Sequence, residues 1–451
     1  MNYINVPKRI NFSDLKEKSF SLSPWLYSNI KTPVKSCLLN DFLVTKLTSN
    51  FLGKEISRKS YIDKSTHFYL VSRAMNEESY TLVKYSQSEI PMIPTKFKDL
   101  KLKKFDILIA KDGKPGEVVI LDQDYPNHMV SGGIYKLPLK DEDKLFLFFI
   151  LKSDYFKQQL SIKVPRGATL KHAGKLFLDC LIPKLDTNQK SDFTKITISI
   201  LNNEIKIKEN FKKINSLIKE ELRNQKSFNY KYPTYKEIKE ENRFDTGIYT
   251  KEFKLIDNLI KVYSKGYVNL KISDFKIGST PKKRIISENI PLKYKWITPD
   301  HVDDLGYLNK FYNIQCEKPN ITKNSLLIIN RTSKGGLGEF VGISFFYDVS
   351  KLGNGRCNQG VHYINNHSDT ELKFFAAFLN SDLMRIYCGR LSMGSKMKEL
   401  KSFHLSKIPI PNFKKNLKEK ISDLYSEIMV LSSLNRKIKK DTENKISNLL
   451  N

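Results

Sequence analysis

The chain has 451 residues, which is too long for one ordinary core and long enough for two or three domains. Its apolar fraction of 40% excludes wholesale disorder. The 77 basic against 48 acidic side chains give a net charge of +29, far more than solubility requires. This charge favours a polyanionic partner, with nucleic acid as the first candidate. A basic surface that serves solubility alone and a peripheral membrane protein are the alternatives.

The cysteines and the N-terminal stretch bear on the compartment. No apolar run approaches the roughly 18 residues that span a bilayer. Residues 1–15 lack the continuous apolar segment of a signal peptide. The 5 cysteines are scattered and form no CxxC pair, so neither a disulfide framework nor a zinc ribbon is indicated. We therefore expect a cytoplasmic protein without membrane contact and without a bound metal.

The chain contains the same series of local patterns twice, in the same order. Residues 105–121 and 325–343 each predict a strand, a basic glycine-containing loop and a second strand. Later landmarks match as well, and the pairs Lys111–Arg331, Gly133–Gly360, Asp154–Asp382 and Pro183–Pro409 give offsets of 331 − 111 = 220, 360 − 133 = 227, 382 − 154 = 228 and 409 − 183 = 226. The sequence therefore predicts two related domains whose surfaces have diverged.

An amphipathic helix is predicted after each copy. Apolar residues recur at intervals of three, four and seven from Phe193 to Leu222 and again from Leu417 to Ile438. The simplest way to bury both narrow apolar stripes is for the two helices to pack on each other in an antiparallel arrangement, which would hold the two domains at a fixed distance. The alternative is that each helix covers the sheet of its own domain.

Sequence motifs of common DNA-modifying enzymes are absent. There is no Pro-Pro dipeptide, which the base-orienting loop of an amino-methylating DNA methyltransferase needs. The sequence GATLKHAGK at residues 167–175 does not fit the spacing of a phosphate-binding loop, and no histidine belongs to an HExxH motif. Gly335, Gly336 and Gly338 fit either a phosphate-binding loop or a turn between strands. Catalysis is therefore expected in another chain, and an enzyme with an unrecognised active site is the alternative.

Loops that combine cations with small polar residues occur at matching positions in the two copies, and such loops suit contacts to DNA. Arginine fits guanine edges and asparagine or glutamine fits adenine edges, so the candidate base-reading residues are Arg166, Arg331, Arg356, Asn358 and Gln359. Candidates for phosphate contacts are Lys111, Lys114, Lys171, Lys175, Lys334, Lys396 and Lys398. Residues 57–75 and 279–302 mix cations with aromatic residues and are further candidates. The alternative for each single residue is a solvated loop position.

Several of these strings resemble the DNA-specificity subunit of type I restriction-modification enzymes, over nearly the whole chain. The match is carried by Gly278, Ser279, Thr280, Pro281, Trp296 and Ile297, together with NRFDTGIY at residues 242–249 and the strings LLIINRTSKGG, NQGVHYI, LSMGSKMKEL and IPIP. The first copy departs from the pattern, because LTSNFLGKEIS stands where Gly-Ser-Thr-Pro is expected.

The resemblance implies a mixed α/β (α+β) chain with two tandem target-recognition domains and two long helices packed as an antiparallel coiled coil. The expected segments are a first recognition domain at 1–185, a helix and connector at 186–241, a second recognition domain at 242–411 and a second helix at 412–451. It further implies a bipartite target in double-stranded DNA and two methyltransferase subunits, which motor and nuclease subunits can join. S-adenosylmethionine is then expected in the methyltransferase partner, and no cofactor or catalytic residue in this chain.

Overall fold

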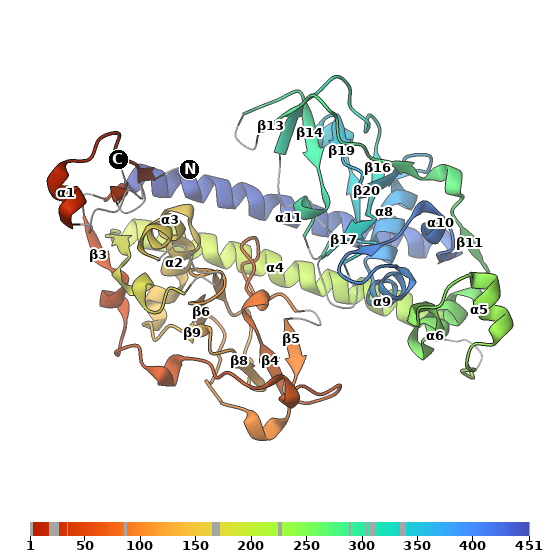
Figure 1. Cartoon of the computed structure of the whole chain (residues 1–451), viewed down its shortest axis with the longest axis horizontal. Helices are drawn as coiled ribbons and strands as arrows, with labels where there is room; N and C mark the ends of the chain where they lie inside the picture. Colours follow the sequence, from red (N-terminus) through yellow and green to blue (C-terminus); the bar gives the residue numbers. More distant parts are fainter. Residues whose placement is uncertain are drawn as a thin grey trace. The chain divides into compact units, whose positions relative to one another are not determined.

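The structure is a computed structural model that describes residues 3–17, 27–33, 35–84, 88–164, 172–223, 228–287, 290–303, 305–306, 312–333 and 340–450. The chain divides into two compact units. Unit 1 contains residues 1–205 and 433–451, and unit 2 contains residues 206–432. Both units mix helices and short strands, as the sequence predicts (Figure 1).

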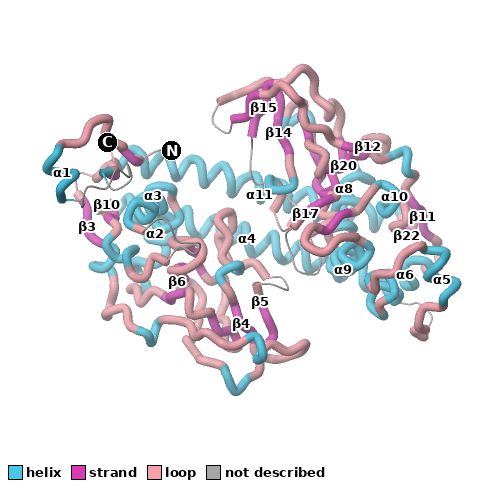
Figure 2. Tube along the Cα trace, in the orientation of Figure 1, coloured by secondary structure: helices cyan, strands magenta, loops and turns pink. Residues whose placement is uncertain are grey.

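Unit 1 is built on two three-stranded sheets. In one, β6 pairs in antiparallel fashion with β7 and β9; in the other, β4 pairs antiparallel with β5 and parallel with β8. Two further pairs are β10 with β3 and β1 with β2. The strands are β1 (Ile4–Asn5), β2 (Asn29–Ile30), β3 (Ser36–Leu38), β4 (Phe68–Leu70), β5 (Glu89–Pro91), β6 (Ile107–Ala110), β7 (Val118–Ile120), β8 (His128–Val130), β9 (Ile134–Lys136) and β10 (Leu181–Pro183). Long loops connect them (Figure 2).

Unit 2 repeats this plan with longer sheets. Here β16 pairs antiparallel with β18 and β20, while β14 pairs antiparallel with β15 and parallel with β19. β12 and β13 extend the two sheets, and β11–β22 and β17–β21 are separate pairs. The strands are β11 (Tyr267–Asn269), β12 (Lys276–Ile277), β13 (Ile285–Ser287), β14 (Tyr294–Ile297), β15 (Tyr312–Gln315), β16 (Ser325–Ile329), β17 (Arg331–Thr332), β18 (Ser344–Tyr347), β19 (Gly355–Cys357), β20 (Val361–Ile364), β21 (Lys398–Glu399) and β22 (Pro409–Pro411).

In each unit, two consecutive helices follow the sheets and meet at a Ser-Asp pair. The sequence predicts a short helix that ends at this pair, and the structure shows in addition that a second helix begins there. Ser153 caps α3 by accepting from the Phe156 N–H, and Ser381 caps α9 by accepting from the Met384 N–H. The helices in the two units, apart from the two long ones, are α1 (Phe12–Glu17), α2 (Asp141–Lys152), α3 (Asp154–Lys163), α5 (Tyr235–Glu241), α6 (Lys251–Lys261), α7 (Val349–Leu352), α8 (Asp369–Leu379), α9 (Asp382–Leu391) and α10 (Ser402–Leu405).

Two details of the sequence comparison are wrong. Lys111 corresponds to Asn330 and not to Arg331, because the Lys111 N–H donates to Gly133 and the Asn330 N–H donates to Gly360. The Ile-Pro strand of the first copy, β10, corresponds to β22, whose last residue is Pro411, and not to a strand ending at Pro409. The offset is then 411 − 183 = 228, in line with 369 − 141 = 228 for the starts of α2 and α8. The IPIP sequence repeats with a two-residue period, which hides this slip.

The two predicted long helices are α4 (Thr187–Leu222) and α11 (Lys415–Leu449), and they pack on each other in an antiparallel arrangement. In unit 1 the Asn203 amide donates to Asn435 Oδ1 at 2.7 Å. In unit 2 the Asn210 amide donates to Glu427 Oε2 at 2.8 Å. Residue numbers rise along α4 while those of their partners on α11 fall, as antiparallel helices require.

Each long helix also contributes to two cores. The first part of α4 packs in unit 1 through Phe193 and Ile200, and the first part of α11 packs in unit 2 through Ile421 and Ile428. The sequence alternative, in which each helix covers its own domain, thus applies to these first parts and coexists with the helix pairing.

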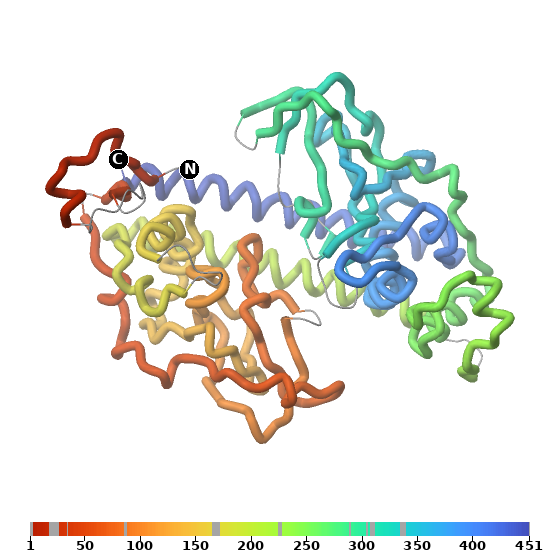
Figure 3. Tube along the Cα trace, in the orientation of Figure 1, coloured from red at the N-terminus to blue at the C-terminus, as the bar shows by residue number. Residues whose placement is uncertain are grey.

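The second parts of the helices are exchanged. Ile218 of α4 belongs to the unit 2 core, whereas Ile446 of α11 belongs to the unit 1 core together with Tyr3. Figure 3 follows the two long helices along the Cα trace, α4 in yellow-green and α11 in blue. These two isoleucines are equivalent, because 446 − 218 = 228. The exchange extends to polar contacts: the N–H of Asp154 at the start of α3 donates to Glu443, and that of Asp382 at the start of α9 donates to Asn215, with 443 − 215 = 228.

We expect Ile446→Ala to destabilise unit 1 and Ile218→Ala to destabilise unit 2. Both side chains are fully buried, and a cavity of this kind costs about 2–5 kcal/mol. Protection from hydrogen exchange should fall at β6 of unit 1 for Ile446→Ala, and at β16 of unit 2 for Ile218→Ala. Val430→Ala, which alters a side chain that is 57% exposed on α11, is the control and should change stability by less than about 0.5 kcal/mol. Loss of protection in the opposite unit would contradict the exchange.

Candidate nucleic-acid interface

Four segments of unit 2 meet at one end of its main sheet. The Gly278 N–H, just after β12, donates to Val361 O at 3.0 Å. Asn330, just after β16, donates its N–H to Gly360 O at 3.1 Å and accepts from the Leu400 N–H at 2.7 Å. The turn before β20, the loop after β12 and the pair β17–β21 are therefore held side by side. Most predicted residues of the second copy lie on these segments.

The guanidinium of Arg356 donates hydrogen bonds to other residues of unit 2 at this end of the sheet. Its Nε and Nη2 donate to Ser279 O at 3.0 Å and Ser279 Oγ at 2.6 Å, and its Nη1 donates to Lys318 O at 2.9 Å. The side chain thus holds the loop at residues 278–281, which contains Gly-Ser-Thr-Pro. The predicted role of Arg356 in base reading stays a prediction, and its present contacts are those of a residue that positions the loop.

The neighbouring predicted residues differ in how far their polar atoms are already engaged. Asn358 Oδ1 accepts from the Gly360 N–H at 2.9 Å, and Gln359 Oε1 accepts from Thr280 Oγ1 at 2.5 Å. Arg331 on β17 and Lys396 before β21 are exposed, while Lys398 on β21 is half-buried. Arg331 and Lys396 are therefore the more accessible of the described cations in the predicted set of this unit.

A buried amide and imidazole support the turn before β20. The Asn330 amide lies 3.1 Å from His362 Nε2 and donates to Gln359 O at 3.3 Å. Burial lowers the pKa of His362, so the imidazole is neutral and fits a hydrogen bond with the amide. Through its hydrogen bond to Gln359 O, the Asn330 amide holds the main chain of this turn in place.

The same end of the sheet in unit 1 has equivalent backbone contacts. Lys111, just after β6, donates its N–H to Gly133 O and accepts from the Ala173 N–H, both at 2.8 Å. The Gly53 N–H donates to Ile134 O at 3.0 Å, as Gly278 does to Val361 in unit 2. The predicted loops at Lys111–Lys114 and around Lys175 are thereby brought together.

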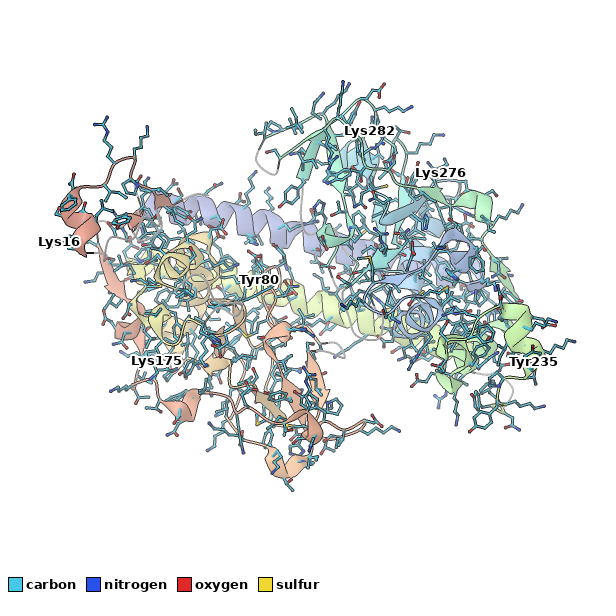
Figure 4. The ribbon with its side chains drawn as sticks, viewed as in Figure 1. Lys16, Tyr80, Lys175, Tyr235, Lys276 and Lys282 are labelled. Carbon is cyan, nitrogen blue, oxygen red and sulfur yellow. The ribbon has the colours of Figure 1, made fainter. Side chains whose placement is uncertain are left out.

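An ion-pair network occupies this end of unit 1. Asp112 accepts from Lys111 Nζ at 2.5 Å and binds His172 Nδ1 at 2.7 Å. Burial alone would raise the pKa of Asp112, but the hydrogen bonds from Lys111 and His172 hold it below its usual value. Lys175 donates to Leu47 O at 2.6 Å, and Lys114 is exposed on the turn (Figure 4 labels Lys175). Among the described predicted cations of this unit, Lys114 and Lys175 are exposed and Lys111 is half-buried.

Three predicted residues, Arg166, Lys171 and Lys334, lie outside the described residues. Of the two longer candidate segments, the one in unit 2 includes Lys282, which is exposed just before β13 (Figure 4). The described residues contain no group of three His, Cys, Asp or Glu side chains arranged to hold a metal ion. Among the helices of the same residues, none is both long and apolar enough to cross a membrane.

No family model and no curated protein matches the chain, but solved structures resemble it. The type I restriction-modification S subunit from M. genitalium is 16% identical with a TM-score of 0.35, over 92% of this chain and 94% of that chain. A chain from a study of assembly and conformational transition of the type I R-M system is 14% identical with a TM-score of 0.29, over 92% and 95%. The HsdS subunit from Thermoanaerobacter tengcongensis is 13% identical with a TM-score of 0.28, over 92% and 96%.

Sequence comparison missed one equivalence, that of Gly53 and Gly278. A Cβ on Gly278 would lie 2.1 Å from Asn358 O, and one on Gly53 would lie 2.1 Å from Ser131 O. In both units the chain approaches the neighbouring strand too closely for any other residue. Gly53 stands in LTSNFLGKEIS, so the first copy keeps the glycine and loses only the Ser-Thr-Pro that follows it in the second.

We expect Gly278→Ala to displace the loop at residues 278–281 and to destabilise unit 2 by about 1–3 kcal/mol, the usual cost of overpacking. Hydrogen exchange at the Ser279 N–H, which donates to Cys357 O at 2.9 Å, should accelerate. Gly53→Ala should do the same in unit 1 and leave Ser279 unaffected. Ser279→Ala is the control for the lost Arg356 contact alone. Unchanged exchange in Gly278→Ala would contradict the close approach.

Proposed function

We propose that this chain is the DNA-specificity subunit of a type I restriction-modification enzyme. The observation that carries the proposal is that the two units repeat one fold and present loops at the same end of equivalent sheets, with different side chains on them. Asp112 in unit 1 and Arg331 in unit 2 occupy equivalent positions, since 331 − 112 = 219 equals 330 − 111 = 219 for the preceding residues. Two related scaffolds with different side chains suit the recognition of two different half-sites.

The net charge of +29 supports duplex DNA as the partner, because each cation near a phosphate releases a condensed counterion. In this proposal each unit binds one half-site of an asymmetric, bipartite target. Two methyltransferase subunits bind the α4–α11 helix pair and hold S-adenosylmethionine, and motor and nuclease subunits join the complex. The present chain binds no cofactor and supplies no catalytic residue, and it acts in the cytoplasm.

Selection of bound sequences from a pool of random DNA duplexes tests the proposal. The full chain should enrich two short, different half-sites separated by a fixed number of unspecified base pairs. Its affinity should fall steeply as salt rises, because phosphate contacts dominate it. The chain incubated alone with DNA, Mg²⁺ and S-adenosylmethionine should leave the DNA unmodified. Methylation or cleavage by the purified chain would instead favour a DNA-modifying enzyme, and one uninterrupted site would favour a stand-alone regulator.

We further expect the α4–α11 pair to set the spacing between half-sites. One heptad inserted after Ile205 in α4 together with one after Ser432 in α11 keeps the antiparallel partners aligned and adds about 10 Å, or roughly three base pairs of DNA. Repeating the selection should show the same half-sites with a longer spacer. A heptad in α4 alone is the control, because it separates Asn210 from Glu427 and should destabilise the chain. An unchanged spacer in the double insertion would refute this role of the helices.

A further inference from the structure

Residues 392–399, which begin directly after α9 and include β21, form a closed hairpin that we call the SMGSKM hairpin. The Met393 N–H donates to Glu399 O at 2.9 Å, and the Glu399 N–H donates to Met393 O at 2.8 Å. Gly394 has a φ of 98°, and a Cβ there would lie 2.1 Å from Met397 O. Only glycine fits such a position, so the sequence holds this hairpin in one shape.

Both ends of the SMGSKM hairpin are fixed to unit 2. At its start, the buried Arg243 donates to Leu391 O at 2.7 Å and to Ser392 O at 3.0 Å. Asp245 holds the same guanidinium through two hydrogen bonds of 2.5 and 2.8 Å. At its end, β21 pairs with β17. Arg243 belongs to the NRFD string at residues 242–245, so that string anchors a loop at the candidate interface.

The exposed surface of the SMGSKM hairpin combines thioethers with cations. Met393 is 44% exposed and Met397 is 48% exposed. Lys396, Lys398 and Lys401 lie close to them in the chain, and Arg331 is adjacent across the β17–β21 pair. No ion pair joins any of these four cations to another described residue. The partner that suits this surface is therefore both anionic and, in part, apolar.

Duplex DNA fits both requirements. Its phosphates suit Lys396 and Lys398, and the thymine methyl group is the apolar feature of base edges in the major groove. Methionine is unbranched and polarizable, which lets it adapt to such a small apolar group. An acidic protein surface would also suit the lysines. If this surface binds such a protein and not DNA, changing the methionines should leave the selected bases unchanged.

We propose that the SMGSKM hairpin reads thymine in the half-site of unit 2, with Met393 and Met397 on the methyl groups and Lys396 and Lys398 on phosphates. This inference rests on the proposed function, and it adds Met393 and Met397 to the residues that the sequence predicts at the interface. The matching stretch of the first copy, PRGATLK at residues 165–171, differs in sequence, so a change here should alter one half-site and leave the other as an internal reference.

The test compares the full wild-type chain with the double variant Met393→Gln, Met397→Gln in the selection from random duplexes. Glutamine keeps the length of methionine and removes its apolar character. Wild type should enrich thymine in one half-site, and the variant should lose that preference while keeping the other half-site. Ile386→Gln, on α9 of the same unit and 43% exposed, is the matched control and should select as wild type does.

Replacing the selected thymines by uracil removes the methyl groups alone. Wild-type affinity should fall about fourfold for each methyl group contacted, as expected for one buried methylene-sized group, and the variant's affinity should not change. Equal selection by wild type and variant, or no effect of uracil, would overturn the inference while leaving the proposed function in place. A wild-type chain that enriches no sequence at all would overturn the proposed function and this inference with it.

Discussion

The exchange of helix ends between the two cores is the constraint on which the rest of the structure depends. The end of α4 packs in the unit 2 core through Ile218 and Leu222, and the end of α11 together with the residue after it packs in the unit 1 core through Ile446 and Leu450. All four side chains are buried, and Leu222 and Leu450 are separated by the same offset as the two isoleucines, 450 − 222 = 228. Neither core is complete unless both helices run their full length, so helix length and domain folding are coupled.

Polar groups set the alignment of the helix pair. Apolar residues alone tolerate a shift by one heptad, whereas a buried amide does not, because it would lose its partner. Asn435 is 3% exposed and contacts both Asn203 and Glu204, and Asn210 is fully buried against Glu427. These contacts cost some stability compared with apolar residues and select one alignment. Under the proposed function, a constant spacing between the two half-sites requires such a fixed alignment.

The sequence predicts well what depends on periodicity. Both long helices, their mutual packing and the strands around residues 105–121 and 325–343 follow from apolar spacing, because burial acts on each turn or pleat in the same way. Contacts between residues that are far apart in the sequence cannot be predicted from this periodicity. Gly53 sits in no motif, and its role comes from the carbonyl of Ser131, 78 residues away (131 − 53 = 78). Likewise, only the structure shows that the Arg356 donors are engaged by Ser279 and Lys318.

The same contrast explains how the two units keep one fold with different surfaces. In both units, hydrogen bonds between main-chain atoms hold the loops together, and these bonds do not depend on the side chains that the loops present. In unit 2, Arg356 and Asn330 add side-chain hydrogen bonds to them. At one equivalent position the backbone pairs Asp112 with His172 in unit 1 and Arg331 with Glu399 in unit 2, which reverses the charge while the pairing stays. A side chain such as that of Asp112 or Arg331 can thus differ between the units while the backbone pairing stays the same. Under the proposed function, a scaffold of this kind can acquire a new target in one unit and retain the old one in the other.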